Sequence, residues 1–333
     1  MPHEEPRADR ADRADQGNQQ GQWGQQDQGR YLEWSTRPTL RNPILIAAFE
    51  GWNDAAEAAT SALTYLQETW DARRFASIDC EGFYDFTETR PMVKLVRGVQ
   101  RRIDWPANEF YYHADPARDR DFVLLAAVEP QLKWRTFTRL VLGLAQDLGV
   151  TTIVTLGALL ADVPHGRPAR VSVTATDDML RKRLGEQGAR GSRYEGPTGI
   201  VGVLQDACGR AGIPGASLWG HAPHYLSASP NPQVQLGILR RLDGLLDLAL
   251  DLRELADEAE TFIAQVNEAV SHDPEATSYV RQLEAQDDEE DDEDEEDGES
   301  FRRPRGPAGA SGSGGGLIQD VEDFLRRRRG DEQ

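Results

Sequence analysis

Apolar runs alternate along the middle of the chain with segments whose apolar residues recur at helical spacing. Residues 43–49 form a continuous apolar run, which is typical of a strand buried on both faces of a parallel sheet. After a turn at 50–53, the apolar positions of residues 55–66 recur every three or four residues, which predicts a helix packed on that sheet. Asp54 and Glu57 have the spacing of a pair that caps a helix N-terminus. The pattern therefore predicts a strand–loop–helix unit.

The same alternation continues to about residue 230 without an internal break. Alternating strands and helices predict an α/β fold, with a mostly parallel sheet between two helical layers. We therefore expect one three-layer α/β/α domain over residues 31–272 with C-terminal helices. The expected strands are 74–81, 109–112, 122–128, 152–157, 169–174 and 215–220, the expected helices are 134–148 and 199–211, and residues 93–103 are expected to form a hairpin.

Residues 231–272 carry an apolar stripe with alternating spacings of four and three, which is typical of a helix-packing seam. Asn231 and Pro232 suit the start of a helix. A second capping pair, Asp251 and Glu254, predicts a break near residue 250. The stripe packs either within the chain or against another subunit.

Low-complexity segments lie at both ends. We expect residues 1–30 to be a disordered tail, 273–285 a short helix, and 286–316 a disordered linker that is first acidic and then rich in Gly and Ser. Residues 317–329 predict a short amphipathic helix that orders only against a surface. It either docks on its own domain, captures a partner or remains unbound. Its apolar face, the candidate partner-binding surface, consists of Leu317, Ile318, Val321, Phe324 and Leu325.

Composition excludes several classes of protein. The formal net charge is −20, which disfavours nucleic-acid binding. No apolar run approaches the roughly 18 residues of a membrane span, and the N-terminal segment lacks the apolar stretch of a secretory signal. The 2 cysteines are too few for a disulfide framework. These features predict a cytoplasmic protein with neither membrane nor nucleic acid among its partners.

Candidate chemistry is confined to the loops that follow predicted strands. The chain has no phosphate-binding loop with a Gly-Lys pair, no zinc-protease helix motif and no G-x-S-x-G elbow. In a parallel sheet, however, the loops after the strands gather at one edge, where ligands bind. Acids and histidines that converge there suit acid–base chemistry, whereas glycines and caps equally make tight turns. The ligand-pocket candidates are Glu50, Gly51, Trp52, Asp54, Gly157, His165, Glu195, Gly196, His221 and His224. We assign no catalytic residue, metal or cofactor.

Several of these loops share an order and spacing with a known family. The matching segments are Phe49–Ala55, Gly157 with Pro164–His165, Tyr194–Gly199, and Pro223–Tyr225 followed by Pro230–Pro232. Over about residues 40–272 the chain resembles the proteasome assembly chaperone two family, and within it the bacterial branch of actinobacterial type. The resemblance implies a three-layer α/β/α fold related to phosphorylase/hydrolase-like domains. It also implies protein partners, because the eukaryotic members are chaperones that bind subunits of the proteasome α-ring.

Two hypotheses follow. The first is a non-catalytic, proteasome assembly chaperone-like module that binds proteasome subunits and forms a homo-oligomer. The alternative is a small-molecule-binding protein or a hydrolase/phosphorylase-like enzyme that uses the loops after the strands. Some relatives dock on the proteasome through a C-terminal tripeptide with a central tyrosine, and residues 331–333 contain no tyrosine. We therefore expect the helix at 317–329 to replace that device.

Overall fold

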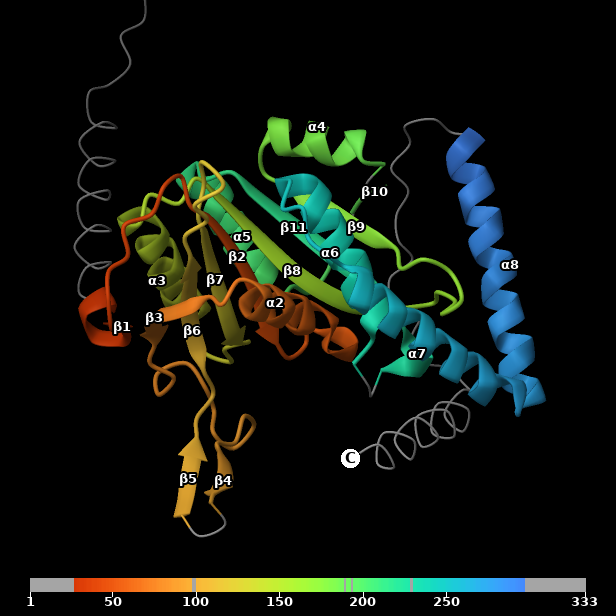
Figure 1. Ribbon diagram of the computed structural model, residues 1–333, viewed down its shortest axis with the longest axis horizontal. Coiled ribbons are helices and arrows are strands. Elements are labelled where there is room, and N and C mark those ends of the chain that lie inside the picture. The colour runs from red at the N-terminus through yellow and green to blue at the C-terminus, as the bar shows by residue number, and fades with distance from the viewer. Residues whose placement is uncertain (1–26, 98–99, 189, 193, 228–229, 297–333) are drawn as a thin grey trace, which may run out of the picture.

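A nine-stranded mixed sheet forms the centre of the molecule (Figure 1). The computed structural model describes residues 27–97, 100–188, 190–192, 194–227 and 230–296. The strand order is β1-β3-β6-β7-β2-β8-β11-β9-β10. The four central strands β7, β2, β8 and β11 are parallel, and the neighbours on either side of them run antiparallel. The strands of this sheet are β1 (Leu32–Trp34), β2 (Ile44–Glu50), β3 (Arg73–Ile78), β6 (Asn108–His113), β7 (Phe122–Val128), β8 (Thr152–Ala161), β9 (Val171–Ala175), β10 (Arg190–Gly191) and β11 (Gly215–Pro223).

Helices cover both faces of the sheet, which confirms the predicted three layers. The strand β2 shows why: Ile44, Ile46 and Ala48 belong to one buried cluster, whereas Leu45 and Phe49 belong to the other. Successive side chains of a strand point to opposite faces, so an all-apolar strand requires cover on both sides. The helices α2 (Ala58–Thr69) and α6 (Pro232–Leu246) pack in the first cluster, and α3 (Trp134–Asp147) and α5 (Ile200–Ala211) pack in the second.

The C-terminal helices pack on the domain and on one another. As predicted, the helical segment breaks near residue 250, between α6 and α7 (Arg253–Ser271). The apolar stripe of α7 packs within the chain: Leu255 and Ala259 join the cluster of α2 and α6, whereas Phe262 and Val266 join a third cluster. That third cluster also holds the short 3-10 helix η2 (His224–Leu226) and α8 (Pro274–Glu296).

The predicted limits of the C-terminal helix are wrong. The helix α8 does not end at residue 285 but continues to Glu296, through most of the acidic run assigned to the linker. Two ion pairs explain why the helix continues through the first acids of this run: Asp287 lies 2.6 Å from Arg170, and Asp288 lies 2.7 Å from Arg167. Like charges that repel in an isolated segment are thus stabilised by a basic surface of the domain.

Two further predictions are corrected, and one helix appears that was not predicted. Residues 27–31 are helical, although we expected disorder to residue 30, and Asp27 lies 3.1 Å from Arg139. The helix α4 (Asp178–Glu186) was not predicted. Asp54 and Glu57 do not form a capping pair, because Glu57 is left-handed (φ 52°) in a 3-10 turn, η1 (Ala55–Glu57), that precedes α2.

A separate hairpin extends away from the central sheet (Figure 1). Its strands, β4 (Met92–Val96) and β5 (Gln100–Asp104), pair only with each other. The hairpin was predicted from the sequence, but its position outside the main sheet was not. No helix within the described ranges has the length and apolar composition needed to span a membrane. Residues 317–329, with all five partner-binding candidates, lie outside the described residues.

Candidate functional site

The strands β2 and β8 separate at the carboxyl edge of the sheet. They pair only as far as Ala47 and Thr155, and the loop after β2 then enters the space between them. Within this loop the Asn53 carbonyl accepts a hydrogen bond of 2.7 Å from the Ala158 amide, and Asp54 forms a bridge with Ala158. Ligands of open α/β sheets bind at this type of gap, so its contents decide what this edge can do.

The gap is closed by side chains of the chain itself. The backbone amide of Glu129 donates a hydrogen bond of 2.8 Å to the Glu50 carbonyl. The side-chain oxygen Oε1 of Glu129 accepts one of 2.9 Å from the backbone amide of Ile200. That amide lies at the N-terminus of α5, which is the position that suits a bound anion. A Cβ on Gly199 would lie 2.6 Å from Glu129 Oε1 and would also overlap the Asn53 amide. The place of an anionic ligand is therefore taken by a carboxylate, which the sequence analysis missed although it directly follows a predicted strand.

Two predicted acids lie beside this closed gap. Asp54 is 8% exposed, and its carboxylate accepts from the Ala59 amide at 2.8 Å, from the Thr60 amide at 3.2 Å and from the Thr60 hydroxyl. Asp54 therefore caps α2 across the 3-10 turn. Burial raises the pKa of Asp54, although the bonds from Thr60 and Ala59 oppose this shift. Burial also raises the pKa of Glu50, and the nearby charge of Asp54 adds to the effect.

The buried amide of Asn53 is an unusual feature of this edge. Its side chain is fully buried, and within the described part of the chain neither Oδ1 nor Nδ2 has a hydrogen-bond partner. A buried amide without partners destabilises the fold by about 1–3 kcal/mol. Asn53 was not among the predicted site residues, because no local pattern distinguishes it from an ordinary turn residue.

The other candidates at this edge are structural or exposed. Gly51 has φ 123°, and a Cβ at this position would lie 3.3 Å from that of Glu129. Gly157 lies against the Trp219 ring, and Gly196 lies against the Tyr194 ring. Both glycines therefore make room for an aromatic side chain. Trp52 is 65% exposed, and Glu195 is also exposed.

The three histidines form a second group, around η2 and the C-terminal helices. The buried His165 ring lies with Nδ1 2.8 Å from the Tyr225 hydroxyl and with Nε2 3.0 Å from Asn267 Oδ1. Burial lowers the pKa of His165, against smaller opposing effects of Asn267 and Glu284. These contacts suit a neutral ring that accepts from tyrosine at Nδ1 and donates to asparagine at Nε2.

The other two histidines also contact neighbouring side chains. His224 Nδ1 lies 3.2 Å from Asp162, and its Nε2 lies 3.3 Å from the Tyr279 hydroxyl of α8. His221 Nε2 lies 3.0 Å from Ser172 Oγ. Both rings thus take part in packing the C-terminal helices or neighbouring strands. Within the described ranges, no three or more His, Cys, Asp or Glu side chains lie together in a way that could hold a metal ion.

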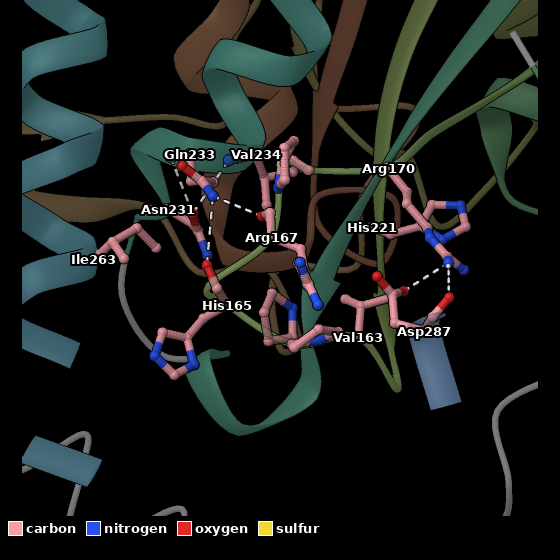
Figure 2. Close-up of a pocket in the computed structure, with 14 residues that line it drawn as sticks. Val163, His165, Arg167, Arg170, His221, Asn231, Gln233, Val234, Ile263 and Asp287 are labelled. Atoms are coloured by element: carbon pink, nitrogen blue, oxygen red, sulfur yellow. Dashed lines mark hydrogen bonds and ion pairs between the residues drawn. The ribbon is translucent and has the colours of Figure 1, made fainter. Parts of the chain in front are cut away.

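A small cavity lies between the histidine group and α8 (Figure 2). His165, His221 and Asn231 line it, and the ion pair of Arg170 with Asp287 lies on one side. Its volume is about 20 Å³, which is enough for one water molecule and too little for a metabolite. His165 and His221 line this cavity near the ends of β8 and β11, whereas Glu50 and Asp54 do not line it, so the predicted convergence of acids and histidines in one site stays a prediction.

Comparison with known proteins agrees with this architecture. A family model described as the PAC2 family matches residues 48–270. A PAC2 family protein from Streptomyces avermitilis is 42% identical, with a TM-score of 0.66, over 72% of this chain and 99% of that chain. A proteasome-assembly chaperone homologue from Mycobacterium tuberculosis is 43% identical, with a TM-score of 0.65, over 71% of this chain and 99% of that chain.

More distant structures share the fold alone. PbaB from Pyrococcus furiosus, an archaeal proteasome activator, is 19% identical, with a TM-score of 0.59, over 71% of this chain and 97% of that chain. Comparison with curated protein sequences found no match.

Proposed function

Because the chain belongs to the PAC2 family, we propose that it is a proteasome assembly chaperone-like protein. In this proposal it is a non-catalytic module of the cytoplasm, which binds proteasome subunits and associates with further copies of itself. The observation that carries the proposal is the 43% identity to a proteasome-assembly chaperone homologue over 99% of that chain.

The carboxyl edge supports a protein-binding role over a catalytic one. Glu129 takes the position at the N-terminus of α5 where an anionic substrate would bind. The cavity beside His165 and His221 has room for a single water molecule. Protein partners, in contrast, need only an accessible surface, and the loops of this edge carry exposed side chains such as Trp52.

We further propose that residues 317–329 recognise the proteasome subunits. Five apolar residues share one helical face in this segment, with acids early and arginines late, an order that stabilises a helix. This segment follows α8 after 20 residues, and a flexible linker of that length spans about 22–27 Å on average. The tether therefore permits helix-in-groove binding to a partner while the domain stays outside the groove.

The test is capture of purified proteasome subunits of the host by the full chain, read by native gel and mass spectrometry. We expect capture by the full chain, and its loss both in a chain that ends at Glu296 and in Phe324→Asp. The matched control is Gln319→Asp, which places the same charge on the polar face of the segment. Failure of the full chain to retain any proteasome subunit would contradict the proposed function. Equal capture by the shortened chain would contradict only the role of 317–329.

One feature favours the alternative, a small-molecule-binding protein or a hydrolase/phosphorylase-like enzyme. The Asn53 amide is buried without a partner among the described residues, and such groups commonly await a ligand or water. Native mass spectrometry of the purified chain distinguishes the two candidates. A bound small molecule that disappears in Asn53→Leu would favour the alternative, whereas a mass equal to that of the polypeptide in both proteins would favour the chaperone-like role.

A further inference from the structure

The hairpin β4–β5 and its flanking residues, 91–105, form an arm that exposes an apolar face. Val93, Leu95 and Ile103 are 58%, 63% and 52% exposed. Val93 pairs with Ile103 and Leu95 pairs with Arg101, and directly opposed residues of an antiparallel pair share a face. The three apolar side chains therefore form one surface. A two-stranded hairpin is marginally stable alone in water, so this surface calls for a partner.

The opposite face of the arm carries charged side chains together with Met92 and Val96. Asp104 lies 2.8 Å from Lys94 Nζ and 2.7 Å from Arg102 Nε. These ion pairs hold the two strands in register, whereas the face of Val93, Leu95 and Ile103 has no ion pair among the described residues. The arm is also basic: residues 91–105 carry a net charge of +3, while the rest of the chain carries −23.

Four exposed apolar side chains lie in segments at the carboxyl edge of the sheet. We define the edge patch as Trp52, Leu132, Leu160 and Tyr194, which are 65%, 48%, 43% and 48% exposed. They come from loops that follow β2 and β7, from the end of β8 and from the loop before α5. Acids accompany them, because Glu50, Glu57 and Glu195 are exposed at the same edge. With the exposed Lys133 beside Leu132, these three acids leave the edge patch with an excess of negative charge, whereas the arm is basic.

The arm does not cover the edge patch of its own chain. It extends away from the central sheet (Figure 1), and the patch residues remain exposed although the arm is present. Both surfaces exist in every copy of the chain and in equal amounts. The surface that is complementary to the arm in both charge and apolar character is therefore always available on another copy.

From this complementarity we infer that the arm of one copy docks on the edge patch of a second copy. This inference deepens the self-association in the proposed function and does not depend on proteasome binding. The contact joins two different surfaces. Its repetition closes a ring where the rotation between copies permits and otherwise extends into a filament, unless two copies exchange arms across a two-fold axis. The loops predicted to hold a small molecule serve instead as the receiving surface for a neighbouring chain.

The first test compares the mass of the full chain in solution with the masses of three variants, by light scattering during gel filtration. We expect the unaltered chain to be an oligomer, and both Val93→Asp with Leu95→Asp on the arm and Trp52→Asp on the patch to be monomers. Met179→Asp is the matched control, because Met179 is 78% exposed on α4, away from both surfaces. It should leave the oligomer unchanged. Circular dichroism checks that each variant is folded, and Arg101→Glu, on the face of Leu95, replaces the first arm variant if it fails to fold.

The second test mixes the arm variant with the patch variant. Each retains the surface that the other lacks, so the mixture should form a dimer with one intact contact, although each alone is a monomer. A mixture that remains monomeric would overturn the inference, as would a monomeric unaltered chain or an oligomer that survives the arm substitutions. High salt should weaken the association, because the distance over which exposed charges attract falls from about 10 Å at 0.1 M to about 3 Å at 1 M ionic strength. Capture of proteasome subunits by the monomeric variants would leave the proposed function standing even if the arm–patch contact fails.

Discussion

The strands β2 and β4 resemble each other in sequence and differ completely in environment. Both are short and apolar, yet Leu45, Ile46 and Phe49 of β2 are fully buried, whereas Val93 and Leu95 of β4 are more than half exposed. The helix that follows β2 returns across its face and covers it. The arm is inserted between β3 and β6, and no helix follows β5 to cover it. An apolar strand therefore requires cover, but its own sequence does not say whether the chain or a partner supplies it.

The largest expected effect separates the two regions directly. Leu124 is fully buried in the sheet, so Leu124→Ala should lower the free energy of unfolding by about 3–4 kcal/mol. Leu95→Ala on the arm should change it by less than about 0.5 kcal/mol in a monomeric background, because an exposed side chain loses little on truncation. Chemical denaturation of both variants measures the contrast. A large loss of stability in the monomeric arm variant would show that the arm packs within its own chain.

The helix α8 should behave as part of the covered region. Leu283 is 3% exposed, in the cluster that joins α7, η2 and α8. Leu283→Ala should therefore cost about 2–3 kcal/mol of local stability and should speed amide hydrogen exchange along α8. Gln282→Ala is the matched control, because Gln282 is exposed. Equal exchange rates in the two variants would mean that α8 gains its order from elsewhere.

The closed carboxyl edge should tolerate no added volume. In Gly199→Ala the new methyl group would overlap Asn53 and Glu129, with an expected loss of about 2 kcal/mol of unfolding free energy. Gly185→Ala is the control, because Gly185 lies in α4 and its Cβ would meet nothing within 4 Å. That replacement should stabilise the protein by about 0.5–1 kcal/mol. Thermal melts of the two variants should thus shift in opposite directions, and a neutral Gly199→Ala would show open space at the edge.

The smallest expected effect concerns the pH dependence of the covered histidine. Because burial lowers the pKa of His165, the unfolded chain takes up a proton there before the folded chain does. Above about pH 6.5 the ring is neutral in both states, and the free energy of unfolding does not depend on it. As the pH falls below about 6.5, proton uptake by the unfolded chain lowers the free energy of unfolding, by at most about 1.4 kcal/mol per pH unit. His165→Gln should therefore flatten the fall in stability between about pH 6.5 and the lower folded-state pKa. The measurement is the unfolding midpoint across this range of pH, with His272→Gln at an exposed position as the control. Midpoints that fall equally with pH in the two variants would refute the lowered pKa of His165.

Much of the fold follows from local patterns in the sequence. The strands β2, β7 and β8 and the break between α6 and α7 were predicted, because side-chain periodicity reflects burial of one or both faces. The continuation of α8 past residue 285 was not predicted, because the first acids of the run, Asp287 and Asp288, pair with Arg170 and Arg167, which lie 117 and 121 residues away in the chain. No window of sequence contains both partners.

The candidate site was predicted less well, for a related reason. The loops after β2 and β8 do meet at the carboxyl edge, as a parallel sheet requires. The distribution of their side chains depends on packing: His165 turns to Tyr225 and Asn267, while Glu129 enters the gap beside Asn53. Neither Glu129 nor Asn53 carries a local signal that marks it as part of the edge.

Periodicity and charge along the chain were thus sufficient for the α/β class, for most of its elements and for the acidic character of the molecule. They also placed the chain in its family through the loops at 49–55 and 194–199. Only the tertiary structure placed Glu129 beside Asn53 at the carboxyl edge, ordered the start of the acidic run and left the arm without cover. The reason is physical: periodicity records whether a side chain is buried, whereas contacts between distant segments decide what buries it.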